Sequence, residues 1–394
     1  MSAATGRWLL CLGLILAAFN LRLIFPSLSV VLPEIMRDLS LSPAVASALT
    51  TLPVVCLGLF APAAPILAGR FGVERVILAL LTLLALGTAM RGLATLPALA
   101  AGSVLAGGAI AMVNVLLPGL VKRDFPERAA PLTGLFTMAL CAGAALAAAA
   151  TVPLEHAFAS AAFGSWPAAL AAWAVPAVLT LPFWLPNALP RPAPRAVAAR
   201  RPSTLLRQPL AWQVTLFMGF QSSLAYAVFG WMAPILRERG LDADTAGYVV
   251  SVSMAGQMTA SLVAPSLATR GRDQRPAALV ATVLAIGAFL TTLYGPLSFV
   301  WAAAVAQGLG QGALIAIALT IIILRSPDIA TAARLSGMAQ GIGYLMAASG
   351  PLLVGLLRDW TGSFAATGPF AVLLGLGAAG AGFGAGRARL LRSG

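Results

Sequence analysis

The sequence predicts an all-α integral membrane protein with twelve transmembrane helices arranged as two six-helix halves. Three observations lead to this fold class: a composition that is 60% hydrophobic and only 9% charged, long apolar runs, and an internal repeat. Soluble domains carry about a quarter charged residues, so a soluble globular protein is excluded. A helix needs about 20 apolar residues to cross a bilayer, and the runs are long enough to provide them.

Twelve apolar runs are bounded by charges, by Pro and Gly clusters or by short polar stretches, and each predicts one transmembrane helix. Prolines and glycines inside the runs are compatible with membrane helices, because neighbouring helices can satisfy the freed backbone groups. The runs cover residues 8–33, 43–69, 76–94, 96–121, 129–154, 165–188, 210–236, 245–269, 277–295, 297–324, 330–357 and 364–386.

The longest polar interval, residues 189–208, is rich in Pro and Arg and divides the runs into six and six. It is typical of a linker between domains. We therefore expect an N-terminal half at residues 1–188, a cytoplasmic linker at 189–208 and a C-terminal half at 209–394.

The two halves are related in sequence. Arg37 matches Arg237 and Leu41 matches Leu241, both at an offset of 200 residues. A duplicated six-span unit is typical of a transporter whose binding site lies between the halves near the membrane midplane.

The net charge of +13 is explained by topology rather than by a charged partner. Of the 25 basic residues, nineteen fall at the ends of runs on one side of the predicted membrane and five on the other. The positive-inside rule then predicts that both termini are cytoplasmic, in a multi-pass protein of a bacterial-type cytoplasmic (inner) membrane. The first run is too long for a cleavable signal peptide. The basic residues are too sparse to form a nucleic-acid-binding face.

Several function classes lack the residues they need. Lys122 is the only lysine and follows no Gly-rich loop, so a Walker A nucleotide site is excluded. We expect Cys11, Cys56 and Cys141, which lie inside apolar runs, to be buried rather than metal-binding. No nucleophile–base set is visible. The sequence therefore predicts neither an enzyme nor a bound cofactor or metal.

Arg22 is the most informative residue because it lies deep inside the first run. It is 15 residues beyond Arg7 and 12 before Glu34, about 22 Å and 18 Å along a helix. Arginine at such a depth costs about 2.5–3.5 kcal/mol on insertion and generally faces a cavity or a partner. All twelve acidic residues lie at or beyond the ends of the runs. We therefore predict that Arg22 binds the negative group of a small anion, since a planar guanidinium suits oxyanions and carboxylates. An intramembrane salt bridge or a carbonyl-capped structural arginine is the alternative.

Neutral polar residues at similar depth are candidates for the rest of the binding site. Around Gln221 the second half is polar but uncharged, which predicts an asymmetric site. Asn20 is two residues from Arg22 and faces elsewhere on a helix, so a helix–helix hydrogen bond competes with a binding role. The polar candidates are Asn20, Asn114, Gln221, Gln257 and Gln340, with Gln307, Gln311 and Tyr344 as further residues at this depth.

Apolar walls should complete the pocket. Phe25 lies three residues after Arg22 and therefore on the same helical face. Trp231 is a second aromatic candidate, although aromatic residues in spans more often serve packing. Phe136, Tyr226 and Phe229 are further candidates.

The segment PILAGRFGVERVIL (65–78) resembles the signature loop between the second and third spans of the major facilitator superfamily, with Arg70, Gly72 and Arg75 in register. Gly69 stands where that pattern normally has Asp. This departure removes the carboxylate that usually contacts the neighbouring span, but it leaves the expected fold unchanged.

A closer resemblance is to the cyanate and 2-nitroimidazole transporters. It is carried by segments in the right order along nearly the whole chain, including Asn20-Leu21-Arg22, GGAIAMVNVLLPGLVKRDF (107–125), SVSMAGQ (251–257) and GMAQGIGYLMAASGP (337–351). That family includes both an anion importer and an exporter of aromatic nitro compounds, so the resemblance leaves substrate and direction open.

We therefore expect a secondary transporter that moves a small monovalent anion, such as a cyanate-like inorganic anion or a compact carboxylate, by alternating access. An exporter of small aromatic or nitroimidazole-type compounds is the first alternative, and a membrane sensor or membrane enzyme is the second. The lack of a midplane Asp, Glu or His favours facilitated or exchange transport over proton symport. The expected partners are the anionic substrate and membrane lipid, with no nucleic acid, and the chain is expected to be a monomer.

Overall fold

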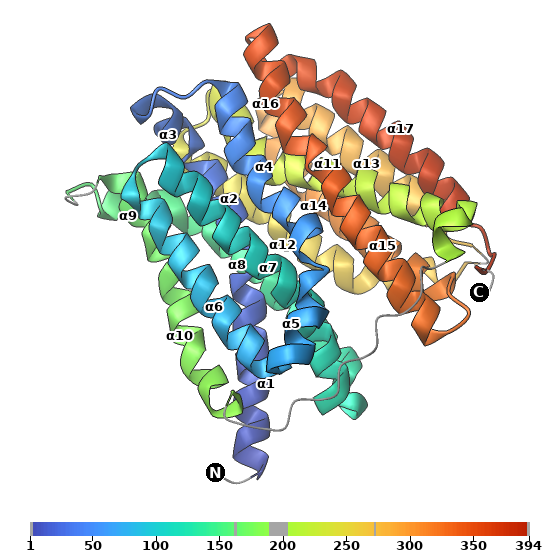
Figure 1. Cartoon of the computed structure of the whole chain (residues 1–394). Coiled ribbons are helices and arrows are strands. Elements are labelled where there is room, and N and C mark those ends of the chain that lie inside the picture. The colour runs from blue at the N-terminus through green and yellow to red at the C-terminus, as the bar shows by residue number, and fades with distance from the viewer. Residues whose placement is uncertain (1–2, 161–163, 189–203, 272, 392–394) are drawn as a thin grey trace.

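The computed structural model describes residues 3–160, 164–188, 204–271 and 273–391, and within these residues it contains helices and no strands (Figure 1). We call α1–α10 the N-terminal half and α11–α17 the C-terminal half. The N-terminal half comprises α1 (Ala3–Asn20), α2 (Ile24–Val30), α3 (Leu32–Asp38), α4 (Pro43–Phe60), α5 (Ala63–Phe71), α6 (Val73–Met90), α7 (Leu96–Asp124), α8 (Ala129–Ala157), α9 (Ser165–Ala172) and α10 (Ala174–Trp184). The C-terminal half comprises α11 (Pro209–Glu238), α12 (Ala243–Ala268), α13 (Arg275–Tyr294), α14 (Val300–Leu324), α15 (Ile329–Ala347), α16 (Ser349–Thr361) and α17 (Thr367–Ala385).

Each of the twelve predicted runs folds as helix. Within the described residues, ten regions are both long and apolar enough to cross a membrane. The other two predicted spans, 210–236 and 245–269, form α11 and α12, which are 30 and 26 residues long. The linker predicted at 189–208 lies outside the described residues up to position 203, and residues Thr204–Arg207 form a short 3-10 turn before α11.

Four predicted spans are interrupted, so the expectation of one continuous helix at 8–33 was wrong. The first span divides into α1, α2 and α3, and the second, sixth and eleventh each divide into two helices. Proline explains the breaks, because it has no N–H to donate to the carbonyl four residues earlier and its ring clashes with that carbonyl. Pro26 lies four residues after Arg22, and Pro351 lies four residues after Ala347, where α15 ends. Arg22 therefore lies at a break in the first span.

The internal repeat is visible in the loops after α3 and α11. Ser40 and Gly240, which are 200 residues apart, both have positive φ values, of 50° and 103°. Ser42 and Asp242 then cap α4 and α12, each by accepting a hydrogen bond from the backbone N–H three residues later. The backbone hydrogen bond lowers the pKa of the Asp242 carboxyl group. The two matched segments therefore share one turn geometry.

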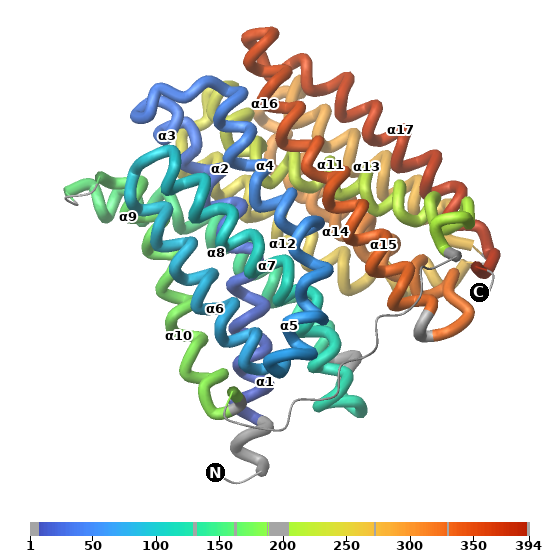
Figure 2. The backbone as a smooth tube through the Cα atoms, in the orientation of Figure 1, coloured from blue at the N-terminus to red at the C-terminus, as the bar shows by residue number. Residues whose placement is uncertain are grey.

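The two halves meet on the side of the bundle where these loops lie, which we call the sealed side (Figure 2). Gly247 of α12 lies against α8, where an added Cβ would be 2.6 Å from the carbonyl oxygen of Ala148. Gly355 of α16 likewise lies against Ser47 of α4. Small residues at these positions let helix backbones approach closely.

An ion pair joins the halves on the same side. Arg237 of α11 lies 2.6 Å from the carboxylate of Glu34 in α3, and the two side chains are only 24% and 11% exposed. Nearby, His156 Nδ1 of α8 lies 3.7 Å from the carboxylate of Asp244 in α12, in a more exposed contact between the halves. The opposite side, where both termini lie, is called the terminal side below (Figure 1).

Breaking the Glu34–Arg237 pair should separate the halves on the sealed side. Hydrogen bonds to charged groups are worth about 1.5–3 kcal/mol, so Glu34→Gln should raise the population that is open on this side by about tenfold or more. Pulsed electron paramagnetic resonance between nitroxides at Val45 and Tyr248, both exposed on the sealed side, would measure this as a longer distance. The exchanged pair, Glu34→Arg with Arg237→Glu, should restore the original distance. An unchanged distance distribution in Glu34→Gln would contradict the role of the pair.

Candidate functional site

A cavity of about 500 Å³ lies between the two halves. Its walls come from α7 and α8 of the N-terminal half and from α11, α12, α14 and α15 of the C-terminal half, with Arg22 between α1 and α2. The polar and titratable residues that line it are Arg22, Asn114, Thr133, Thr137, Cys141, Gln257, Ser261, Thr320, Ser336, Gln340 and Tyr344. Most of the remaining wall is aliphatic or aromatic. A mainly apolar cavity with a few polar groups is the usual form of a small-molecule site.

The cavity is open toward the terminal side and closed toward the sealed side. Ile323, near the end of α14, is 68% exposed, and Thr133, near the start of α8, is also exposed. Ala144 and Phe229, at the other end of the lining, are buried. Beyond them lie the close contacts between α8 and α12.

Arg22 lies at the buried end of the cavity and contacts aromatic rings rather than a carboxylate. Its guanidinium carbon is 5.3 Å from the ring centre of Phe229 and 5.7 Å from that of Tyr226, both on α11. All twelve acidic residues of the chain lie in the described part, and none forms an ion pair with Arg22 there. The predicted alternative of an intramembrane salt bridge is therefore not found in the described structure. Cation–π contacts stabilise the charge and leave the guanidinium without a countercharge.

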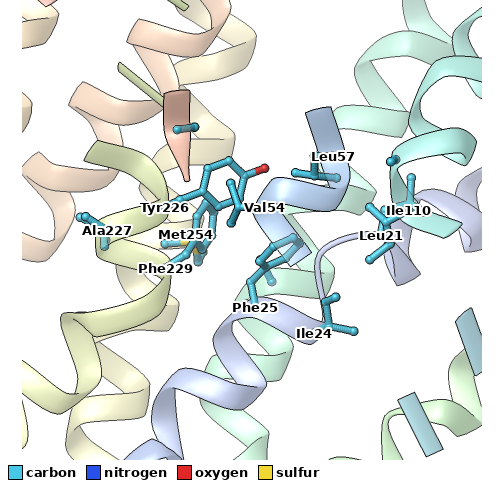
Figure 3. Packing of buried hydrophobic residues seen from close by; sticks show 14 of the residues in the cluster. Leu21, Ile24, Phe25, Val54, Leu57, Ile110, Tyr226, Ala227, Phe229 and Met254 are labelled. Atoms are coloured by element: carbon cyan, nitrogen blue, oxygen red, sulfur yellow. The ribbon is translucent and has the colours of Figure 1, made fainter. Parts of the chain in front are cut away.

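Four aromatic residues cluster beside Arg22. Phe25, Tyr226 and Phe229 pack with ring centres 5.4–6.3 Å apart, and Tyr344 meets Tyr226 edge-on at 6.2 Å. Figure 3 shows Phe25 of the N-terminal half pointing toward Tyr226 and Phe229 of the C-terminal half. Phe229 and Tyr344 also line the cavity, so an apolar, aromatic surface adjoins Arg22, the one charged group among the described lining residues.

Four of the eight predicted site residues line the cavity: Arg22, Asn114, Gln257 and Gln340. They come from four different segments of the chain, two from each half. The Gln340 amide nitrogen donates to Ser336 Oγ at 2.7 Å, which orients its carbonyl oxygen. The site is asymmetric, with one positive group in the N-terminal half and neutral amides opposite.

The other four predicted residues lie outside the lining. Asn20 is buried and donates to Leu16 O at 2.8 Å and to Thr180 Oγ1 at 3.1 Å, which is the helix–helix contact that competed with a binding role. The Gln221 amide donates to Ser222 Oγ at 2.6 Å. Trp231 donates to Pro351 O at 2.9 Å on the sealed side, and Phe25 belongs to the aromatic cluster.

Several small polar residues that line the cavity were not predicted from the sequence. Helical spacing could have indicated two of them, because Ser261 lies four residues after Gln257 and Ser336 lies four before Gln340. Thr133, Thr137 and Cys141 repeat every four residues along α8. Residues four apart lie on the same helical face, so extending Gln257 and Gln340 by one turn would have found Ser261 and Ser336, whereas no predicted amide lies on α8.

A second buried arginine does not face the cavity. Arg91 lies near the end of the third predicted span, on the sealed side, where it begins a 3-10 turn, and its side chain is only 1% exposed. None of its guanidinium nitrogens has a hydrogen-bond partner within the described residues. Arg22 differs from Arg91 because a ligand can reach it.

The loop after α5 keeps a charged contact despite the missing Asp at position 69. Arg123 near the end of α7 pairs with Glu74 of α6 at 2.5 Å and with Asp124 at 2.8 Å. Gly72 has a φ of 90° between α5 and α6, a conformation that favours glycine. A different carboxylate therefore connects the neighbouring spans on the terminal side.

This architecture defines a membrane transport protein. A model of the Major Facilitator Superfamily matches residues 10–238 and again residues 215–385. The chain belongs to this superfamily, whose members are transporters rather than enzymes.

Similar proteins place the chain more narrowly within this superfamily. The chain is 38% identical over 362 residues to the 2-nitroimidazole transporter of Escherichia coli, covering 91% of this chain and 90% of the relative. It is 30% identical over 355 residues to the cyanate transport protein CynX of Escherichia coli, covering 90% and 91%. The solved D-xylose–proton symporter has the same fold, with a TM-score of 0.75 at 14% identity, covering 99% of this chain and 100% of that chain. The resemblance predicted from the sequence motifs is confirmed.

The cavity geometry predicts selective reactivity of one thiol. Cys141 lines the cavity, whereas Cys56 is only 3% exposed. In single-cysteine proteins, a small water-soluble thiol reagent should modify Cys141 at least about tenfold faster than Cys56, because buried structural cysteines are inert. Reaction rates followed by mass spectrometry would measure this. Equal rates would contradict the described cavity.

Proposed function

We propose that this transporter moves a small monovalent anion across the membrane and that Arg22 binds the anion's negative group. The observation that carries the proposal is a guanidinium inside a cavity between the halves with no carboxylate partner in the described structure. An anionic ligand supplies the missing charge, and the planar guanidinium can donate two parallel hydrogen bonds to an oxyanion or carboxylate. Asn114, Gln257 and Gln340 supply neutral hydrogen-bonding groups around it.

Alternating access accounts for the rest of the architecture. The repeated turns, the cavity between the halves and the sealed opposite side are features of carriers in which one half rocks against the other. The cavity lining contains no Asp, Glu or His within the described residues. Facilitated or exchange transport therefore remains favoured over proton coupling through the protein, and the positive-inside pattern supports a cytoplasmic terminal side.

Export of small aromatic or nitroimidazole-type compounds is the second candidate, and the aromatic cluster favours it. Phe229 and Tyr344 offer apolar surface beside Arg22, and the relative named 2-nitroimidazole transporter covers nearly the whole chain. A nitro group has two planar oxygens that a guanidinium can approach as it approaches a carboxylate. Both candidate substrates would bind to Arg22 through oxygen atoms. They differ in whether an aromatic ring is attached to the group that Arg22 contacts.

Replacing Arg22 should strongly weaken anion binding. Truncating one partner of a buried charge pair costs about 2–5 kcal/mol, so Arg22→Gln should weaken binding by a factor of about thirty or more, and Arg22→Lys should rescue it only partly because it loses the planar fork. A thermal-shift screen of cyanate, nitrate, benzoate and 2-nitroimidazole on purified protein would measure this. Arg37→Gln, an exposed arginine on the sealed side, is the matched control. A ligand that stabilises Arg22→Gln as much as the unaltered protein would contradict the assignment.

Changes in the aromatic wall should separate the two candidate substrates. Aromatic pairs contribute about 0.5–1.5 kcal/mol beyond burial, so Phe229→Leu should weaken binding of benzoate or 2-nitroimidazole by about threefold to tenfold while leaving cyanate binding nearly unchanged. Isothermal titration calorimetry on the variant would measure the ratio. If Phe229→Leu weakens binding of all these ligands equally, the ring serves only to position Arg22. Loss of cyanate binding alone would contradict the aromatic contact.

A further inference from the structure

We propose that this carrier is an obligate anion exchanger, because Arg22 prevents the empty protein from changing its open side. The inference rests on the proposed function, in which Arg22 is the anion receptor. It adds the coupling mode, which determines whether the protein can carry out net transport at all.

Each change of the open side takes the charge of Arg22 through a closed intermediate. In the described structure Arg22 is half-buried at the inner end of a cavity that is open to the terminal side. Water reaching the cavity can hydrate its charge. When the halves rock, the terminal side closes before the sealed side opens, and the guanidinium loses that water.

No Asp, Glu or His lines the cavity beside Arg22 within the described residues. The lining residues Tyr344 and Cys141 carry a phenol and a thiol, groups that are ordinarily protonated and neutral near neutral pH. Arginine itself keeps its proton under all ordinary conditions. The empty site therefore keeps a full positive charge during closure.

The aromatic contacts stabilise this charge only in part. Phe229 and Tyr226 lie over the guanidinium at 5.3 and 5.7 Å, but a ring face stabilises a dehydrated cation less than a paired anion does. Burying an unpaired charge is costly. A bound monovalent anion makes the site neutral, so the loaded carrier closes far more readily than the empty one.

The consequence is one-for-one exchange. A loaded carrier releases its anion on one side and must bind another anion there before it can return. Exchange of two monovalent anions moves no net charge, and the two anion gradients alone drive it.

The experiment follows the conformational step itself, without needing the natural substrate. Ser253 lies one turn from the cavity residue Gln257 toward the sealed side, is 1% exposed, and its Oγ has no hydrogen-bond partner within the described residues. Ser253→Cys therefore reports opening of the sealed side. Ser261→Cys, one turn beyond Gln257 in the opposite direction and in the cavity lining, reports closure of the terminal side. Both are made with Cys11, Cys56 and Cys141 replaced by alanine, in nanodiscs, and labelled with a water-soluble maleimide.

In gluconate buffer, Ser253→Cys should be labelled slowly while Arg22 is present, and at least about tenfold faster with Arg22→Gln, because the unpaired charge is gone. Labelling of Ser261→Cys should become slower when Arg22→Gln is introduced, because the terminal side is then closed more of the time. In a separate transport assay with proteoliposomes, isotopically labelled benzoate or cyanate should enter at least about tenfold faster when the same anion, without the isotope, is inside.

Equal labelling of Ser253→Cys with Arg22 and with Arg22→Gln would overturn the exchange proposal. Equal uptake into loaded and empty liposomes would do the same. Failure of the proposed function has a different result, because Arg22→Gln would then still bind anions in the thermal-shift screen. Glu34→Gln is the positive control, since loosening the sealed side should speed labelling of Ser253→Cys whatever the charge at Arg22.

Discussion

A guanidinium held inside the membrane without a carboxylate is the constraint on which this structure depends. Arg22 belongs to the N-terminal half, yet the rings that support it, Tyr226 and Phe229, belong to the C-terminal half. The charge therefore lies at the contact between the two halves. Under the proposed alternating access, its energy depends on hydration, aromatic contact and ligand, each of which changes when the halves rock. In this proposal, binding and conformational change are coupled through one side chain.

The backbone that presents Arg22 is itself broken. Pro26 removes the N–H that would bond to the carbonyl of Arg22, so α1 ends at Asn20 and α2 begins at Ile24. The same proline spacing interrupts the eleventh span after Ala347. Interrupted spans beside a central cavity are common in transporters, because irregular backbone is tolerated in a membrane only where protein or water surrounds it. The sealed side, in contrast, relies on close helix packing and the Glu34–Arg237 pair.

Much of this account could be predicted from the sequence, because membrane insertion makes local signals strong. Apolar runs located the spans, and the lone charge at Arg22 located the cavity. Periodicity could not show which way a helix faces, so Asn20 and Trp231 were grouped with the site. In the structure, Asn20 donates a hydrogen bond to Thr180 of α10, and Trp231 donates one to Pro351 O. Burial of Arg91 was not predicted either, because the sequence shows only that this residue lies near the end of the third run. Tertiary packing decides these cases, and no local pattern encodes it.

The central claim is that Arg22 itself receives the anion, and side-chain nitrogen NMR tests it most directly. Arginine Nε signals of the ¹⁵N-labelled protein are recorded while cyanate, nitrate or benzoate is added, and the Arg22 signal is assigned by its loss in Arg22→Lys. The account predicts a saturable shift of the Arg22 signal with any anion that stabilises the protein, while the other arginine signals stay in place. An anion that raises the melting temperature yet leaves the Arg22 signal unmoved would contradict it.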